Sequence, residues 1–202
     1  MANLIWLVPL FPLIGVLING LFLSGASAAT RRKWSGWIAV TMVALSFACA
    51  LSIAAGLRGI LGDQRYYDAV FDSWIEIGNL NVPLALRIDP LSVTMMLVVT
   101  GVGTLIHIFS VGYMADDERF TRFFTYLNLF TFSMLILVLA NNYVLMFVGW
   151  EGVGLCSYLL IGFWFERVSA AQAGKKAFLI NRVGDFGFLL GLFALFALTG
   201  SL

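Results

Sequence analysis

The sequence has little charge, and this scarcity decides the class of protein. Asp, Glu, Lys and Arg make up only 11% of the 202 residues, whereas 61% are hydrophobic. Together with a mean hydropathy of +0.95, this composition excludes an ordinary soluble domain and is typical of a protein with several membrane-spanning helices. The net charge of +1 indicates no particular partner, so the positions of the few charges carry the information.

Thiol and imidazole side chains are also scarce. The chain has two cysteines and one histidine, which are too few for a zinc ligand set. Cys49 and Cys156 both fall within long apolar runs, which argues against a disulfide or a metal site. The sequence contains no dinucleotide-binding fingerprint, no cysteine cluster and no pair of haem ligands. We therefore expect no redox site, metal or bound cofactor on this chain.

Long apolar runs are abundant and predict six membrane helices. Each run is about 20 residues long, the length that crosses a hydrocarbon core of roughly 30 Å. The runs cover residues 4–23, 34–57, 91–113, 120–139, 143–165 and 177–198. Between the second and third runs, alternating apolar and polar residues at 66–89, interrupted by the letters GNLN, predict a β-hairpin. The expected fold is an all-α polytopic membrane protein with one hairpin outside the membrane.

The positive-inside rule gives these helices a direction. If the amino terminus is outside, the inner loops hold eight Lys or Arg side chains and the outer loops hold three. The inner set is Arg31, Arg32, Lys33, Arg119, Arg122, Arg167, Lys175 and Lys176, and the outer set is Arg58, Arg65 and Arg87. We therefore expect both ends of the chain and the hairpin to face outward.

Three shorter signals refine the ends of the helices. Pro90 stands where it can open the third helix. Asp116, Asp117 and Glu118 precede the fourth helix, and we interpret them as a cap at its positive dipole end. The letters ANN at 140–142 predict a tight turn, so the fourth and fifth helices should form an antiparallel pair.

Two spans contain ionisable side chains. Glu151 lies within LMFVGWEGVGLCSYLLIGFW, where a carboxylate costs roughly 3 kcal/mol to insert and normally has a partner. The residues one turn away on its own helix are Phe, Val, Gly and Leu, so a basic group on another helix must neutralise Glu151, or it must take up a proton. Arg182 and Asp185, in INRVGDFG, lie three residues apart on one helical face, which predicts an ion pair.

The positions of Glu151 and Asp185 place both near the middle of the membrane. Each lies eight residues from an end of its predicted helix, about 12 Å deep. Small residues accompany them, because Gly149, Gly152 and Gly154 flank the glutamate, and Gly184, Gly187 and Gly191 follow the second helix. The last two form a GxxxG pattern that permits close helix approach.

Purely structural roles remain open for all of these groups. Glu151 could be a buried carboxyl that holds helices together, and Arg182 with Asp185 could serve assembly alone. His107, in LIHIFSVGYM, could relay protons because its charge changes near neutral pH. A packing or hydrogen-bonding role is the alternative for this histidine.

The letters from His107 onward resemble a known family. HIFSVGYMADDERFTRFFTYLNLFTFSMLILVLANNYVLMFVGWEGVGLCSYLLIGFWFE, followed by AGKKAFLINRVGDFG, resembles the L-type antiporter-like subunit of respiratory complex I, the counterpart of the fifth mitochondrial membrane subunit. The similarity covers essentially the whole chain and is densest from about residue 91 onward. GWEGVGLCSYLLIGFW is its specific part, because sibling subunits and Mrp-type sodium/proton antiporters keep the Trp and Glu but differ in the residues after them.

The resemblance implies a proton-translocating module, driven by NADH:quinone oxidoreduction elsewhere in a complex of the bacterial inner membrane. FMN, iron–sulfur clusters and quinone would belong to partner subunits, and the neighbours would be other membrane subunits, especially another antiporter-like one. The family's glutamate maps onto Glu151, and its arginine and aspartate map onto Arg182 and Asp185. In the family this glutamate pairs with a lysine on a broken seventh helix, which is absent from these 202 residues.

The same resemblance suggests two parts within the chain. Residues 1–119 would hold three peripheral helices with the hairpin, and residues 120–202 the first three helices of an inverted repeat. Because the family's lysine partner of Glu151 is absent from these residues, we expect them not to translocate protons alone. An Mrp-type sodium/proton antiporter subunit and a membrane scaffold are the two alternatives. A scaffold predicts that Glu151 can be neutralised without loss of pumping.

Overall fold

Six long helices and one hairpin make up the computed structural model, which describes residues 2–23, 25–61, 64–78 and 80–201. The elements follow one another as α1 (Ala2–Leu17), the π-helical turn η1 (Ile18–Phe22), α2 (Ala28–Leu61), β1 (Tyr67–Ile77), β2 (Leu80–Ile88), α3 (Pro90–Tyr113), α4 (Phe120–Leu139), α5 (Tyr143–Ile161) and α6 (Val168–Thr199). Within the described residues, six helical segments are long and apolar enough to cross a membrane. This confirms the prediction of six spans.

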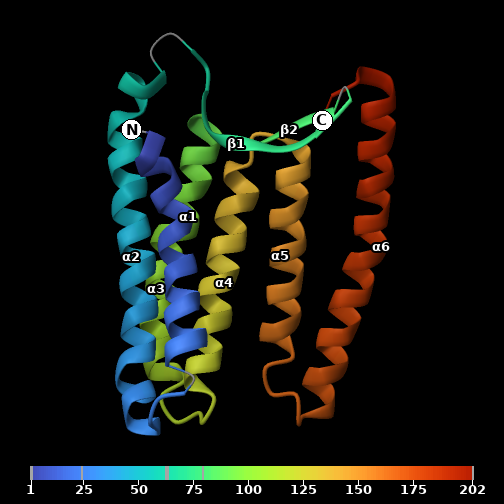
Figure 1. The fold of residues 1–202 in the computed structure, drawn as a ribbon. Helices are drawn as coiled ribbons and strands as arrows, with labels where there is room; N and C mark the ends of the chain where they lie inside the picture. The colour runs from blue at the N-terminus through green and yellow to red at the C-terminus, as the bar shows by residue number, and fades with distance from the viewer. Residues whose placement is uncertain (1, 24, 62–63, 79, 202) are drawn as a thin grey trace.

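The helices run side by side, and the hairpin lies across one end of them (Figure 1). α1 packs against α2 and α4, and α3 packs against α2. α5 packs against α4, while α6 stands at the edge and packs against α5. The described ends of the chain both lie at the hairpin end, as an even number of spans requires.

The predicted hairpin is present, and its turn falls within the letters GNLN. β1 and β2 are antiparallel, with Tyr67 opposite Ile88 and Ile77 opposite Leu80. Gly78 has a φ of +58°, a left-handed conformation that glycine adopts without strain. Arg87 donates two hydrogen bonds of 2.9 Å to the carboxylate of Asp68 on the facing strand. This paired contact joins the two strands, and its hydrogen bonds raise the pKa of Arg87.

Polar caps explain where α3 and α5 begin. Pro90 is the first residue of α3, as predicted, and Asp89 accepts a 2.7 Å hydrogen bond from the backbone nitrogen of Ser92. The Ser92 hydroxyl accepts one from Asp89 in return, which completes a capping box. Asn142 caps α5 through the backbone nitrogen of Leu145, and its side-chain nitrogen donates to the carbonyl of Pro83. The tight turn at 140–142 therefore also anchors the hairpin.

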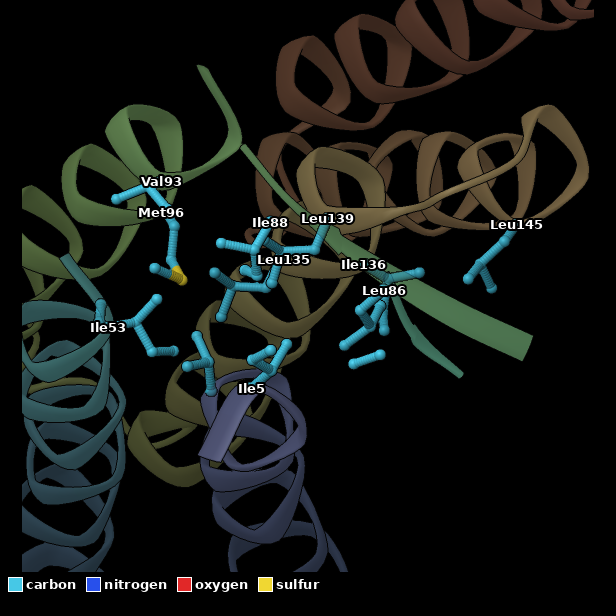
Figure 2. Close-up of a cluster of buried hydrophobic side chains, with 13 residues drawn as sticks. Ile5, Ile53, Leu86, Ile88, Val93, Met96, Leu135, Ile136, Leu139 and Leu145 are labelled. Carbon is cyan, nitrogen blue, oxygen red and sulfur yellow. The ribbon is translucent and has the colours of Figure 1, made fainter. Parts of the chain in front are cut away.

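A cluster of buried apolar side chains joins the hairpin to the helices beneath it (Figure 2). Leu86 and Ile88 of β2 lie among Ile5 of α1, Ile53 of α2 and Leu135 of α4. Among the described residues, every member of this cluster belongs to α1–α5 or the hairpin. The hairpin end of the first five helices is therefore packed as one unit, whereas α6 is attached mainly through α5.

Several helix ends differ from the predicted ones. α2 extends beyond 34–57 in both directions, and α5 ends at Ile161 rather than at residue 165. α6 begins at Val168 rather than at residue 177, so Lys175 and Lys176 lie inside the helix. The apolar runs underestimate α2 and α6 because Ala, Gln, Arg and Lys are good helix formers that hydropathy ignores.

The interpretation of the acidic cluster before α4 as a helix cap is wrong. The N-cap residue is Arg119, and it makes no side-chain capping bond. Asp117 instead accepts hydrogen bonds from the backbone nitrogen of Arg119 at 2.7 Å and from the indole of Trp164 at 2.8 Å. Beside it, Arg119 forms an ion pair with Glu166, and the hydrogen bond from Arg119 lowers the pKa of this carboxyl. These contacts tie the α3–α4 loop to the α5–α6 loop.

Candidate functional site

Arg182 of α6 lies between two carboxylates. Its Nη1 forms an ion pair with Oε2 of Glu151, which is on α5. Its Nε lies 3.3 Å from Oδ2 of Asp185, one turn further along α6. The predicted Arg182–Asp185 pair is confirmed. Glu151 also has a basic partner on another helix, but the sequence alone did not indicate that Arg182 would be shared between both carboxylates.

The two contacts of Arg182 are unequal. Neither its Nε nor Oδ2 of Asp185 makes a hydrogen bond, although the two atoms are within ion-pair distance. The other oxygen of Asp185 accepts a 2.8 Å hydrogen bond from the indole nitrogen of Trp150. Asp185 is only 5% exposed, so this indole satisfies half of a buried carboxylate. With all three side chains ionised, the one guanidinium and two carboxylates would carry one net negative charge.

Aromatic rings hold the groups of this site in place. Phe188 of α6 stacks on Trp150 with ring centroids 6.2 Å apart and planes 9° apart. Phe147 stacks on the same phenylalanine at 5.6 Å. The guanidinium of Arg182 lies 4.6 Å from the ring centroid of Phe178, a cation–π contact. The polar contacts between α5 and α6 are therefore bordered by a packed aromatic surface.

The glycines near Glu151 allow α5 to approach its neighbours. A Cβ atom at Gly152 would lie 2.6 Å from the hydroxyl of Ser133 on α4, and one at Gly154 would lie 3.4 Å from Nη2 of Arg182. By contrast, a Cβ at Gly184, Gly187 or Gly191 would meet nothing within 4 Å. Within the part of the chain that the structure describes, the GxxxG pattern of α6 therefore mediates no helix contact.

Glu151 lies at its predicted distance from the start of its helix, whereas Asp185 lies further from the start of α6 than predicted. Glu151 lies eight residues after Tyr143, where α5 begins. Asp185 lies more than four turns into α6, because that helix begins at Val168. Both carboxylates are nevertheless close enough to contact the same guanidinium.

A cavity of about 460 Å³ lies beside Asp185, between α4, α5 and α6. Its polar lining consists of Trp150, Ser157, Asn181 and Asp185, and the rest is apolar or glycine. A cavity of this size with several polar groups can hold ordered water. Water next to a buried carboxylate is what proton exchange with that carboxylate needs.

His107 lies outside this network, between α3 and α4. It is 1% exposed, with Nδ1 2.7 Å from the carbonyl of Gly103 and Nε2 2.9 Å from the side-chain oxygen of Asn128. The Gly103 carbonyl can only accept, so Nδ1 carries a proton. These bonds tie α3 to α4, and the proton relay suggested for His107 stays a prediction.

Groups that could bind a metal are not assembled in the described residues. There, no three His, Cys, Asp or Glu side chains lie close enough together to hold an ion. Cys49 of α2 and Cys156 of α5 are free thiols.

Two family models match the chain. The model for NADH-ubiquinone oxidoreductase (complex I), chain 5 N-terminus, matches residues 74–124, and the model for the transmembrane region of NADH:quinone oxidoreductase and Mrp antiporters matches residues 140–202. The chain belongs to the antiporter-like membrane subunits of complex I. The second matched region of this complex I family contains Glu151, Arg182 and Asp185.

Curated relatives with complex I names match nearly the whole chain. NAD(P)H-quinone oxidoreductase subunit 5 from Zygnema circumcarinatum chloroplasts is 47% identical over 98% of this chain and 28% of the relative. NADH-quinone oxidoreductase subunit L from Mycobacterium tuberculosis is 47% identical over 98% of this chain and 30% of the relative. Subunit L from Neisseria meningitidis is 45% identical over 96% and 28%. The chain thus spans less than a third of the length of these relatives.

Solved structures share the fold of this complex I family member. Part of the membrane-bound sulfane sulfur reductase, an archaeal respiratory membrane complex, matches 97% of this chain and 28% of its own, with a TM-score of 0.73 and 21% identity. Part of the Mrp complex from Dietzia sp. DQ12-45-1b matches 98% of this chain and 20% of its own, with a TM-score of 0.77 and 24% identity. At these identities the similarity shows the fold alone.

Trp150 is the site residue that sequence reasoning missed. Its signal was present, because an indole N–H deep in an apolar span needs an acceptor. Trp150 also directly precedes Glu151. The acceptor, Asp185, lies on another helix, so the partner could not be read from local spacing.

Proposed function

We propose that this chain forms part of a proton-translocating membrane subunit of an NADH:quinone oxidoreductase. The observation that carries the proposal is the position of Arg182, which contacts Glu151 on α5 and Asp185 on its own helix. A cation shared between two carboxylates can shift from one to the other without changing the net charge of the three groups. The names of the relatives support the type of complex.

The proposed mechanism rests on the charge of Glu151. While Arg182 contacts Glu151, the carboxylate stays ionised, because a nearby opposite charge favours the charged form. When the guanidinium moves toward Asp185, Glu151 loses its partner in a medium where an unpaired charge is costly, so it takes up a proton. The return of Arg182 releases that proton. A change in the relative position of α5 and α6 would therefore load and unload Glu151.

The surroundings of the chain belong to the same proposal. The redox groups, namely FMN, iron–sulfur clusters and quinone, would belong to partner subunits, and this chain would contact other membrane subunits, among them a second antiporter-like one. The chain would lie in a bacterial inner membrane with both of its ends outside. Residues 1–119 would form a peripheral unit, and residues 120–202 the start of the antiporter-like repeat.

Neutralising Glu151 in the full-length protein tests the proposal. The Glu151→Gln variant keeps the shape of the side chain but cannot titrate. We expect the complex to assemble with its cofactors while proton translocation per electron falls strongly, by roughly tenfold or more, the loss typical of removing an essential proton-transfer group. Glu151→Asp should be milder. The measurement is the acidification of the interior of inverted membrane vesicles while they oxidise NADH. It is performed with and without sodium.

Glu166→Gln provides a matched control, because Glu166 also pairs with an arginine but lies in a loop. It should leave the proton-to-electron ratio unchanged. An unchanged ratio in Glu151→Gln would contradict the proposal and favour a membrane scaffold. Pumping that requires sodium would favour the Mrp-type alternative.

A further inference from the structure

We propose that Trp150 is a positioning residue that determines how Arg182 is divided between Glu151 and Asp185. The inference rests on the proposed function of Glu151 and names a residue through which that site is controlled. Trp150 acts through the 2.8 Å hydrogen bond from its indole nitrogen to Oδ1 of Asp185.

Asp185 competes with Glu151 for Arg182 from the same helix as the arginine. The two residues are three apart on α6, so their side chains remain within reach whatever α5 does. An arginine fork prefers two parallel hydrogen bonds to one carboxylate. In this structure, however, the Nε and Oδ2 atoms stay 3.3 Å apart without forming a hydrogen bond, and Nη1 of Arg182 pairs with Glu151. The other oxygen of Asp185 has a different donor, which leaves the guanidinium available to Glu151.

The indole of Trp150 supplies what Asp185 would otherwise take from Arg182. Asp185 is 5% exposed, and a carboxylate oxygen buried to this extent needs a donor. Without the indole, Oδ1 would lack this hydrogen bond, and the guanidinium is the adjacent charged donor. Arg182 would then form a two-bond contact with Asp185 and withdraw from Glu151.

The geometry also couples the indole to the glutamate. Trp150 and Glu151 are consecutive residues of α5, and their partners, Asp185 and Arg182, both belong to α6. Phe188, one turn beyond Asp185, stacks on the indole and keeps it against α6. A shift of α5 along α6 therefore changes the contacts of Trp150 and Glu151 together, so that the loss of one favours the loss of the other.

Replacing the indole by a ring without a donor tests this role. The Trp150→Phe variant, made in the full-length protein within its assembled complex, keeps an aromatic surface for Phe188 but removes the N–H. We expect the share of complexes in which Arg182 contacts Glu151 to fall about tenfold, the change that corresponds to losing one charge-assisted hydrogen bond. Electron cryo-microscopy would show the guanidinium on Asp185. Infrared spectroscopy would show a new carboxyl C=O band, absent when Glu151→Gln is added.

Two further variants separate positioning from packing. Trp37→Phe makes the same change at a tryptophan of α2 that is 56% exposed, and it should alter neither measurement. In the Asp185→Asn background there is no competing carboxylate, so adding Trp150→Phe should change nothing further. If Trp150→Phe prevents assembly, benzothienylalanine at this position keeps the size of the ring and replaces the N–H by sulfur.

The outcomes distinguish this inference from the proposed function. If Arg182 stays on Glu151 in Trp150→Phe, or if Trp150→Phe has the same effect with and without Asp185→Asn, the positioning role is overturned. If Arg182 moves to Asp185 as expected but proton translocation is unchanged, Trp150 does position the arginine, and it is the function proposed for Glu151 that is contradicted.

Discussion

Gly149 faces the backbone of Leu137 so closely that a Cβ atom at position 149 would lie 2.5 Å from the Leu137 nitrogen. This contact joins α5 to α4 two residues before Glu151. A flexible side chain could move aside, but backbone cannot, so the helices approach this closely only because the residue is glycine. The position of Glu151 is therefore set from α4 as well as from α6.

We expect Gly149→Ala to push α5 away from α4. The clash with backbone should lower the free energy of unfolding by about 1 to 3 kcal/mol, the usual cost of overpacking. The measurements are the thermal stability of the purified complex and its amount in the membrane. Gly59→Ala is the matched control, because a Cβ there meets nothing within 4 Å, and stability should not fall. Equal stability of the two variants would show that α5 does not depend on this contact.

Because Arg182 contacts two carboxylates, neutralising one of them should destabilise the protein less than neutralising the arginine. A purely local pair would make Asp185→Asn harmful, because Arg182 would be left uncompensated. Since Glu151 also contacts Arg182, the charge that remains in Asp185→Asn is still paired. Arg182→Gln, in contrast, leaves two carboxylates without a cation. It should cost about 1 to 3 kcal/mol more than Asp185→Asn, less than in a fully buried pair, because Arg182 and Glu151 are partly exposed.

A double-mutant comparison measures this difference through assembly and thermal stability. Combining Arg182→Gln with Asp185→Asn should recover part of the loss, because one of the two uncompensated carboxylates is removed. If Asp185→Asn alone proves more harmful than Arg182→Gln, the contact between Arg182 and Glu151 is not important in the assembled protein.

Local features of this fold could be predicted from the sequence. The six spans depend on runs of apolar residues, the hairpin on alternation and a glycine turn, and the Arg182–Asp185 pair on a spacing of three within one helix. Each signal involves neighbours in the chain. The start of α6 could not be found in this way, because its first turns are helical without being apolar.

Side-chain pairs between helices could not be predicted. The pairing of Glu151 with Arg182 depends on how α5 and α6 are turned toward each other, and so does the hydrogen bond from Trp150 to Asp185. Asp117 illustrates the same limit, because its indole partner, Trp164, is distant in the sequence. The sequence therefore identified the ionisable residues of the candidate site and the pair within α6, but not the pairs that join α5 to α6.

Variants of His107 can distinguish a proton relay from a role in holding α3 against α4 by hydrogen bonds. The Asn128 amide can offer its oxygen to a protonated Nε2 or, after a half turn, its nitrogen to a neutral one. In the structure, the side-chain nitrogen of Asn128 has no hydrogen-bond partner, and it lies 2.1 Å from where a Cβ of Gly15 would be. We expect His107→Gln and Gly15→Ala both to destabilise the complex by about 1 to 3 kcal/mol. Proton translocation per assembled complex should stay unchanged, whereas a selective loss in His107→Gln would support the relay.

The ion pair between Arg119 and Glu166 should make stability depend on pH. The hydrogen bond from Arg119 lowers the pKa of Glu166 in the folded protein, so the pair stabilises the fold above the ordinary pKa of a glutamate, about 4.3. The contribution is lost as the pH falls through the lowered folded value. Thermal unfolding in detergent at a series of acidic pH values measures it.

Glu166→Gln should remove this contribution, so the difference from the natural protein should be present near neutral pH and vanish in acid. Glu76→Gln, at an exposed glutamate of the hairpin, should follow the natural protein throughout. A Glu166→Gln difference that persists undiminished in strong acid would show that the carboxylate does not act through its charge.

The membrane orientation can be tested at the two ends of the bundle. The start of α2 and strand β1 lie at opposite ends of the spans (Figure 1). Ser27 directly precedes α2 and Glu76 belongs to β1, whereas Asn79 lies outside the described residues. The excess of Lys and Arg in the loops on the Ser27 side predicts that this side faces the cytoplasm. A charged maleimide that cannot cross membranes should therefore label Glu76→Cys in intact cells, and Ser27→Cys only after the cells are opened. Cys49 and Cys156 lie within the spans and should not react in either case. Labelling of both engineered cysteines in intact cells would contradict the topology and, with it, the direction in which Glu151 would move a proton.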